Sequence, residues 1–136
     1  MYGIVKNINK DIMIQYILDT FMPKKMKNGK WKEFNRQAIL IAEGFYKNDI
    51  RHGTWRFYYE SGELAIEENY HEGKLHGRYA AYHMNGIMMS EGHYHQDQRQ
   101  GPFYIYNDRG ILEKVLIFEK NTLLEETAPT PLTQTA

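Results

Sequence analysis

The sequence predicts an all-β protein, an antiparallel β-meander of stacked hairpins with a 24-residue repeat. Glycine and tyrosine each recur at this interval in two series: Gly53, Gly77, Gly101; Gly62, Gly86, Gly110; Tyr46, Tyr70, Tyr94; and Tyr58, Tyr82, Tyr106. An aromatic series at Trp55, Tyr79 and Phe103 and an acidic series at Glu43, Glu67 and Glu91 keep the same register. Because a fixed period of this length signals a repeat architecture, it decides the fold class before any single element is assigned.

Each unit is expected to be one hairpin. The segment "GTWRFYYESGELAIEENY" contains an aromatic and β-branched run, a turn at "ESG" and a second run, as two paired strands require. The turns "HMNG" and "NDRG" of the next units contain residues that tolerate positive φ. We expect one domain over residues 1–126, with clear units at about 42–65, 66–89 and 90–113 and partial units at both ends.

The two ends of the chain are less regular. Residues 11–22 fit a helix through Ile14, Ile17, Leu18 and Phe21, but continuing the 24-residue step aligns this segment with a strand, which we prefer. Residues 2–6 would then pair with it as an edge strand. Residues 127–136 are rich in proline and threonine and poor in large apolar side chains, so we expect a disordered tail.

Composition excludes several classes of function. The 136 residues include 17 basic and 17 acidic side chains, so net charge gives no reason to expect a nucleic acid partner. There is no cysteine, which removes disulfides and thiolate metal sites. The start of the chain has neither a secretory h-region nor a run of about 20 apolar residues, and a cytoplasmic protein is expected.

The repeated residues resemble those of a known family. The pattern G-x-[aromatic]-x-x-Y-x-x-x-G over about residues 20–120 resembles the MORN repeat (membrane occupation and recognition nexus). It is closest to the variant in bacterial proteins often labelled as antitoxins of toxin-antitoxin systems. Three residues depart from the pattern: Ala38 replaces the turn glycine, and Asp49 and Asp97 stand where the middle unit has Gly73. The resemblance implies protein binding, scaffolding or membrane apposition, including an antitoxin- or inhibitor-like role, and it does not imply catalysis.

The sequence contains no pattern that indicates an enzyme or a cofactor site. Ser61 and Ser90 lie outside a G-x-S-x-G elbow, and the glycines are not spaced as a phosphate-binding loop. On a strand, Glu91, His93 and His95 would share one face but stand about 6.6 Å apart, too far to converge on one ion at about 2 Å. We therefore expect no catalytic residue, no cofactor and no metal.

Residues that differ between units at solvent-facing positions are the better candidates for recognition. Arg56, Tyr59, His83 and Tyr104 occupy such positions, and tyrosine and arginine are enriched where protein interfaces gain most of their affinity. We expect these four residues to bind a protein partner, whose identity the sequence does not give.

A basic stretch offers an alternative function. Residues 24–36 hold six basic side chains and one acidic one, so Lys24, Lys25, Lys27 and Lys30 could meet an anionic lipid surface. The protein would then be a membrane-surface adaptor. The competing interpretation is that these lysines prevent an exposed sheet edge from pairing with strands of other molecules.

Overall fold

The computed structural model describes residues 9–22 and 24–129. Within them the chain forms one helix and ten strands: α1 Lys10–Phe21, β1 Gly29–Phe34, β2 Leu40–Lys47, β3 Ile50–Tyr58, β4 Leu64–His71, β5 Lys74–Tyr82, β6 Met88–His95, β7 Gln98–Arg99, β8 Gly101–Tyr106, β9 Leu112–Glu119 and β10 Thr122–Thr127. No helix in this part of the chain is long and apolar enough to cross a membrane.

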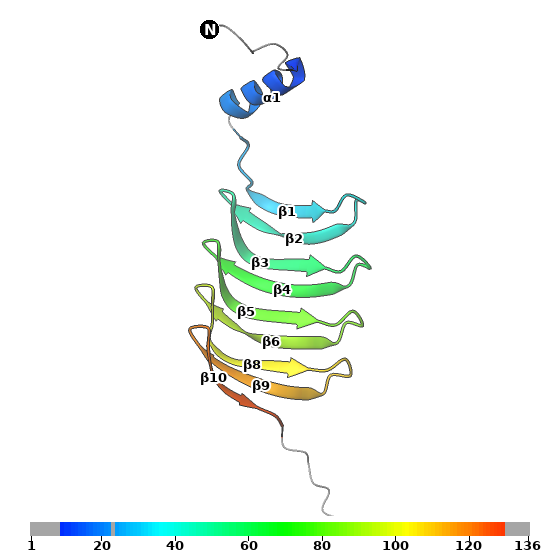
Figure 1. Ribbon diagram of the computed structural model, residues 1–136, viewed down its shortest axis with the longest axis vertical. Coiled ribbons are helices and arrows are strands. Elements are labelled where there is room, and N and C mark those ends of the chain that lie inside the picture. The colour runs from blue at the N-terminus through cyan, green and yellow to red at the C-terminus, as the bar shows by residue number, and fades with distance from the viewer. Residues whose placement is uncertain (1–8, 23, 130–136) are drawn as a thin grey trace, which may run out of the picture.

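The strands form a single antiparallel meander, which confirms the predicted fold class. The order in the sheet follows the sequence from β1 to β10, and the short β7 pairs with β6 beside that path. The strands lie one above another in a column, with α1 beyond β1 and β10 at the other end (Figure 1). The hairpins are therefore stacked side by side, and β1 and β10 are the two edges of the sheet.

Consecutive hairpins are joined by tight two-residue turns. Strand pairing continues up to each turn, for example between Lys47 and Ile50 and between His95 and Gln98. Both central residues of each turn have positive φ; they are Asn48–Asp49, Glu72–Gly73, Gln96–Asp97 and Lys120–Asn121. Turns of this kind match the right-handed twist of paired strands, so the turns fix the register from one hairpin to the next.

Each tight turn also holds the backbone of the preceding hairpin. The Asp49 amide donates to the carbonyl of Lys27, and its carboxylate accepts from the Lys27 amide at 2.6 Å. Asp97 makes the same pair of bonds with Leu75, and Asn121 with Arg99. Gly73 supplies only the backbone bond, and a Cβ there would lie 2.8 Å from Cγ2 of Ile50. The aspartates that depart from the repeat pattern thus fasten one hairpin to the next.

One group of aromatic side chains, which includes Tyr46, Trp55, Phe103 and Phe118, packs on one face of the sheet. Trp55 is fully buried although the sheet is a single layer, and its Nε1 donates to the carbonyl of Phe45 at 3.0 Å. Its ring lies directly over Gly44, where a Cβ would overlap the indole, and the ring of Phe103 covers Gly92 in the same way. Edge-to-face contacts continue through Tyr46–Trp55 and Phe103–Phe118, with centroids 4.9 and 5.4 Å apart.

Cations from β3 and β7 lie over these rings. Gly53 has a φ of 67°, a conformation that glycine adopts without a steric cost, and the pairing of β2 with β3 shifts beside it. The Arg51 guanidinium carbon lies 4.4 Å from the centroid of the Trp55 ring, and that of Arg99 lies 4.0 Å from the Phe118 ring. Such stacking covers the aromatic face without a second sheet.

The preference for a strand over residues 11–22 is wrong, because α1 occupies this segment. Asn9 caps the helix by accepting a hydrogen bond from the amide of Asp11 at 3.0 Å, which satisfies a donor that has no partner inside the helix. Apolar side chains at helical spacing decide the structure here, so the repeat register was extended one unit too far. The expected edge strand at residues 2–6 lies outside the described residues.

Strand β10 runs to Thr127, the first residue of the expected tail. Residues 130–136 of the expected tail lie outside the described residues.

Replacing Ala38 by glycine should stabilise the protein. Ala38 has a φ of 60° and closes the same hydrogen-bonded turn as Gly62. The left-handed conformation costs an L-residue about 1–2 kcal/mol, and glycine's extra chain entropy offsets only about 0.5–1 kcal/mol. Chemical denaturation should show Ala38→Gly gaining about 0.5–1 kcal/mol. The matched control Gly62→Ala, with open space around the new Cβ, should lose a similar amount; the same sign for both variants would contradict this explanation.

Candidate functional site

The face opposite the rings of Trp55 and Phe103 carries a row of mostly charged and polar side chains, although the row also includes Val115 and the fully buried Ala80. Cross-strand pairing aligns eight residues in this row: Lys32, Glu43, Arg56, Glu67, Ala80, Glu91, Tyr104 and Val115. We call this surface the polar face. Arg56 and Tyr104, both expected to bind a partner, thus lie on one face. Four strand spacings separate them, which is about 19 Å.

Ion pairs connect the row at its amino-terminal half. Lys32 Nζ lies 3.6 Å from a carboxylate oxygen of Glu43, and Arg56 Nε lies 2.9 Å from Glu67. Arg78 reaches both Glu67 and Glu91 at 3.5 Å. The arginine side chains in these pairs are 47% and 42% exposed, and pairs as exposed as this contribute little to stability. Their charged groups therefore remain available to a partner.

A tyrosine beneath the row keeps one of its carboxylates ionised. The hydroxyl of Tyr58 donates to Glu43 at 2.6 Å. This bond, with the positive charges of Lys32 and Arg56, lowers the pKa of Glu43 below its ordinary value, although desolvation acts in the opposite direction. Desolvation and the bond to Glu43 raise the pKa of Tyr58 to about 12. Glu43 therefore presents a fixed negative charge between two cations at neutral pH.

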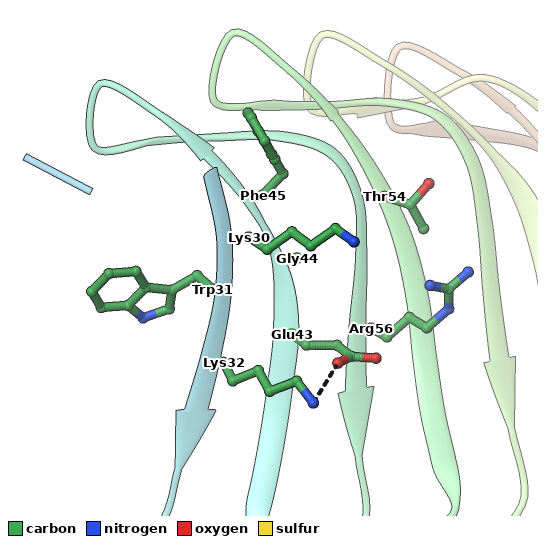
Figure 2. A pocket seen from close by; sticks show the side chains of 8 residues that line it. All are labelled: Lys30, Trp31, Lys32, Glu43, Gly44, Phe45, Thr54 and Arg56. Carbon is green, nitrogen blue, oxygen red and sulfur yellow. Dashed lines mark ion pairs between the residues drawn. The ribbon is translucent and has the colours of Figure 1, made fainter. Parts of the chain in front are cut away.

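A shallow hollow of about 330 Å³ opens at the amino-terminal end of the polar face. In Figure 2 the side chains of Lys30, Lys32, Glu43 and Arg56 border this hollow, while Trp31 points away from it. Phe45 adds an apolar wall and is 42% exposed. The hollow brings together Lys30 from the basic stretch and Arg56 from the expected partner-binding residues, which the sequence treated as separate sites.

Tyr59 and His83 do not belong to the row. Each lies in the turn that closes its hairpin and bonds to the neighbouring hairpin: the Tyr59 hydroxyl donates to the carbonyl of Tyr82 at 2.7 Å, and Nε2 of His83 lies 3.1 Å from the carbonyl of Tyr106. Their hydrogen bonds show that both link adjacent hairpins.

The basic stretch is also divided in the structure. Lys27 Nζ lies 4.7 Å from the Trp31 ring centroid and 4.8 Å from that of Tyr46, so Lys27 helps to cover the aromatic face. Lys24 and Lys25 are exposed between α1 and β1, and Lys30 borders the hollow. Only part of the stretch is thus presented to solvent.

Four of the six histidines form a ladder of neighbouring rings. His52, His71, His76 and His95 follow one another with ring centroids 6.0, 5.8 and 4.9 Å apart. Nδ1 of His76 is buried without a hydrogen-bond partner. Among the described residues, no group of three or more histidine, aspartate or glutamate side chains is placed to hold a metal ion.

Two features of the site were missed by sequence reasoning. Gly44 and Gly92 seat the aromatic rings on the opposite face, and their 48-residue separation, twice the repeat, could have indicated them. The cations at positions 27, 51 and 99 lie at multiples of the 24-residue repeat, with Leu75 at the intervening position. Their stacking on the rings explains why these positions hold lysine or arginine.

Comparison with known proteins supports the repeat resemblance. A family model described as a MORN repeat variant matches residues 51–72, which cover most of β3 and all of β4. A comparison with curated proteins found no match. The chain therefore contains a unit similar to a MORN repeat, a kind of module that generally serves protein or membrane interaction without catalysis.

Removing the Tyr58 hydroxyl should raise the pKa of Glu43. In Tyr58→Phe the carboxylate loses the bond that most lowers its pKa, so a carboxyl-carbon NMR titration should show the pKa moving up towards the ordinary value. A carboxyl whose pKa is lower in the folded state than in the unfolded state stabilises the fold at pH values above its unfolded-state pKa, and this stabilisation is lost as the pH falls. Tyr58→Phe should therefore lose part of this stabilisation at neutral pH. Tyr106→Phe, which breaks the equivalent 3.3 Å bond to Glu91, is the control. If the pKa of Glu43 is unchanged in Tyr58→Phe, or if it rises equally in Tyr58→Phe and Tyr106→Phe, the Tyr58 hydroxyl is not what lowers it.

Proposed function

We propose that this protein is a non-enzymatic interaction module that binds a protein partner through its polar face. One observation carries the proposal: the rings of Trp55 and Phe103 pack on one face of the sheet, whereas Arg56 and Tyr104, which differ between units, lie on the other face beside the repeated glutamates. In this proposal the main aromatic packing and the recognition by Arg56 and Tyr104 use opposite surfaces. The similarity of residues 51–72 to a MORN repeat variant supports a binding role rather than a catalytic one.

The charges of the polar face indicate the chemistry of the partner that would bind there. Its cations alternate with carboxylates from Lys32 to Arg78 and give way to Tyr104. An extended segment with complementary charges could lie across several strands, with an acidic group in the hollow beside Lys30 and Arg56. Alternating charge gives specificity and orientation more than raw affinity.

An inhibitor- or antitoxin-like role is one form of this function. In that form the bound protein would be a toxin, and occupation of the polar face would hold it inactive. The proposal rests on the resemblance to bacterial antitoxin-labelled proteins, and the identity of the captured protein is what tests it.

Arg56→Ala and Tyr104→Ala should weaken partner binding at least tenfold, which corresponds to about 1.4 kcal/mol. Melting temperatures should stay nearly unchanged, because Glu67 retains Arg78 as an ion-pair partner when Arg56 is removed. The partner would be captured from the native host with the full-length chain, identified, purified and titrated against each variant.

The matched control is Arg109→Ala, which removes an exposed arginine from the turn between β8 and β9. It should bind like the wild type. If Arg56→Ala and Tyr104→Ala also bind like the wild type, recognition does not use the polar face. If they lose binding together with thermal stability, the separation of the two surfaces is wrong.

A further inference from the structure

Helix α1 exposes an unusual amount of apolar surface. None of its residues is buried. Ile14, Ile17, Leu18 and Phe21 follow helical spacing and form one apolar stripe, in which these side chains are 46%, 48%, 40% and 77% exposed. Large contiguous exposed apolar patches mark interaction sites.

The polar residues of α1 lie to one side of this stripe. Asp11, Gln15 and Asp19 are spaced by four residues and occupy one strip of the helix, in which Asp11 borders the apolar stripe at Leu18 and Asp19 lies farthest from it. The Gln15 side chain donates to the Asp19 carboxylate at 2.9 Å, which holds that charge within the strip. The helix can therefore lie flat on a surface with its apolar stripe down and its acidic groups in water.

Positive charge follows the helix directly. Lys24 and Lys25 are exposed just beyond α1, and Lys30 is exposed on β1. Glu33 is the one acidic residue among positions 24–36, against six basic ones. An apolar helix alone would suit a protein groove, but an apolar stripe joined to an unbalanced lysine cluster suits an anionic bilayer, where the two contributions add.

We propose that α1 and the following lysines form a peripheral anchor on anionic membranes. The stripe of α1 inserts at the boundary between headgroups and acyl chains, and Lys24 and Lys25 contact the headgroups. This adds an insertion element to the basic stretch already recognised in the sequence. Because α1 lies beyond the end of the column of strands (Figure 1), the polar face stays open while the anchor is engaged. The proposal does not depend on the protein-binding function.

Cosedimentation of the full-length chain with vesicles tests the anchor. Vesicles of phosphatidylcholine containing phosphatidylserine should bind the protein, and pure phosphatidylcholine vesicles should bind it much more weakly. Binding should fall between low and physiological salt, where the screening length is about 8 Å. Equal binding to both vesicle types, or no binding to either, would overturn the proposal.

Two pairs of variants separate the two contributions. Phe21→Glu should weaken binding at least tenfold, whereas Gln15→Glu adds the same charge to the polar strip and should change binding little. Lys24→Gln with Lys25→Gln should weaken binding about 30-fold, equivalent to about 1 kcal/mol per lysine. The control pair Lys74→Gln with Lys120→Gln removes the same charge from exposed positions far along the chain. If a variant and its control lose vesicle binding equally, the position of the substituted residue does not matter, and this result would contradict the anchor.

A further measurement distinguishes lipid binding by α1 from self-association through α1. Sedimentation velocity without lipid should give a species whose mass does not depend on Phe21. Self-association that Phe21→Glu abolishes would assign the stripe to a second copy of the chain and overturn the lipid proposal. Loss of vesicle binding in Phe21→Glu with partner binding retained would leave the proposed function intact.

Discussion

The structure depends on how an aromatic ring is seated on a glycine of the neighbouring strand and then covered by a cation. A single sheet has no second layer to bury its side chains against, yet Trp55 is fully buried. Gly44 provides the seat because it has no Cβ, and Arg51 closes the other side of the ring. Burial of aromatic surface is the largest stabilising contribution available to such a sheet. The tight turns add backbone bonds that keep each hairpin in register with the one before it.

This arrangement leaves the opposite face of the sheet open to the proposed recognition. The rings of Trp55 and Phe103 pack towards Gly44 and Gly92, although Ala80 is fully buried on the opposite face. That face also carries a row of partly exposed ion pairs that contribute little to folding. Arg56, Ala80 and Tyr104 occupy equivalent positions in it, so the side chain at this position changes from unit to unit. Tyr59 and His83 lie outside this row, and their side chains bond from turn to turn.

The repeat spacing predicted the meander because glycine and aromatic residues are required at fixed places in every hairpin. It also placed Ala38 in a glycine position, where the turn keeps its left-handed conformation. It failed at residues 11–22, where local capping and apolar spacing favour a helix over the repeat register. The hollow that joins Lys30 to Arg56 could not be predicted, because strand pairing decides which side chains meet across β1, β2 and β3. The seats at Gly44 and Gly92 could have been found at twice the repeat spacing.

A double-mutant cycle on Gly44 and Trp55 tests the seating of the ring most directly. Trp55→Ala should lower the free energy of unfolding by about 3–5 kcal/mol, and Gly44→Ala by about 1–3 kcal/mol, because the new Cβ displaces the indole. In the Trp55→Ala background Gly44→Ala should cost almost nothing, so the two effects should fall short of additivity by at least about 1 kcal/mol. Additive effects within about 0.5 kcal/mol would show that the ring and the glycine do not act together.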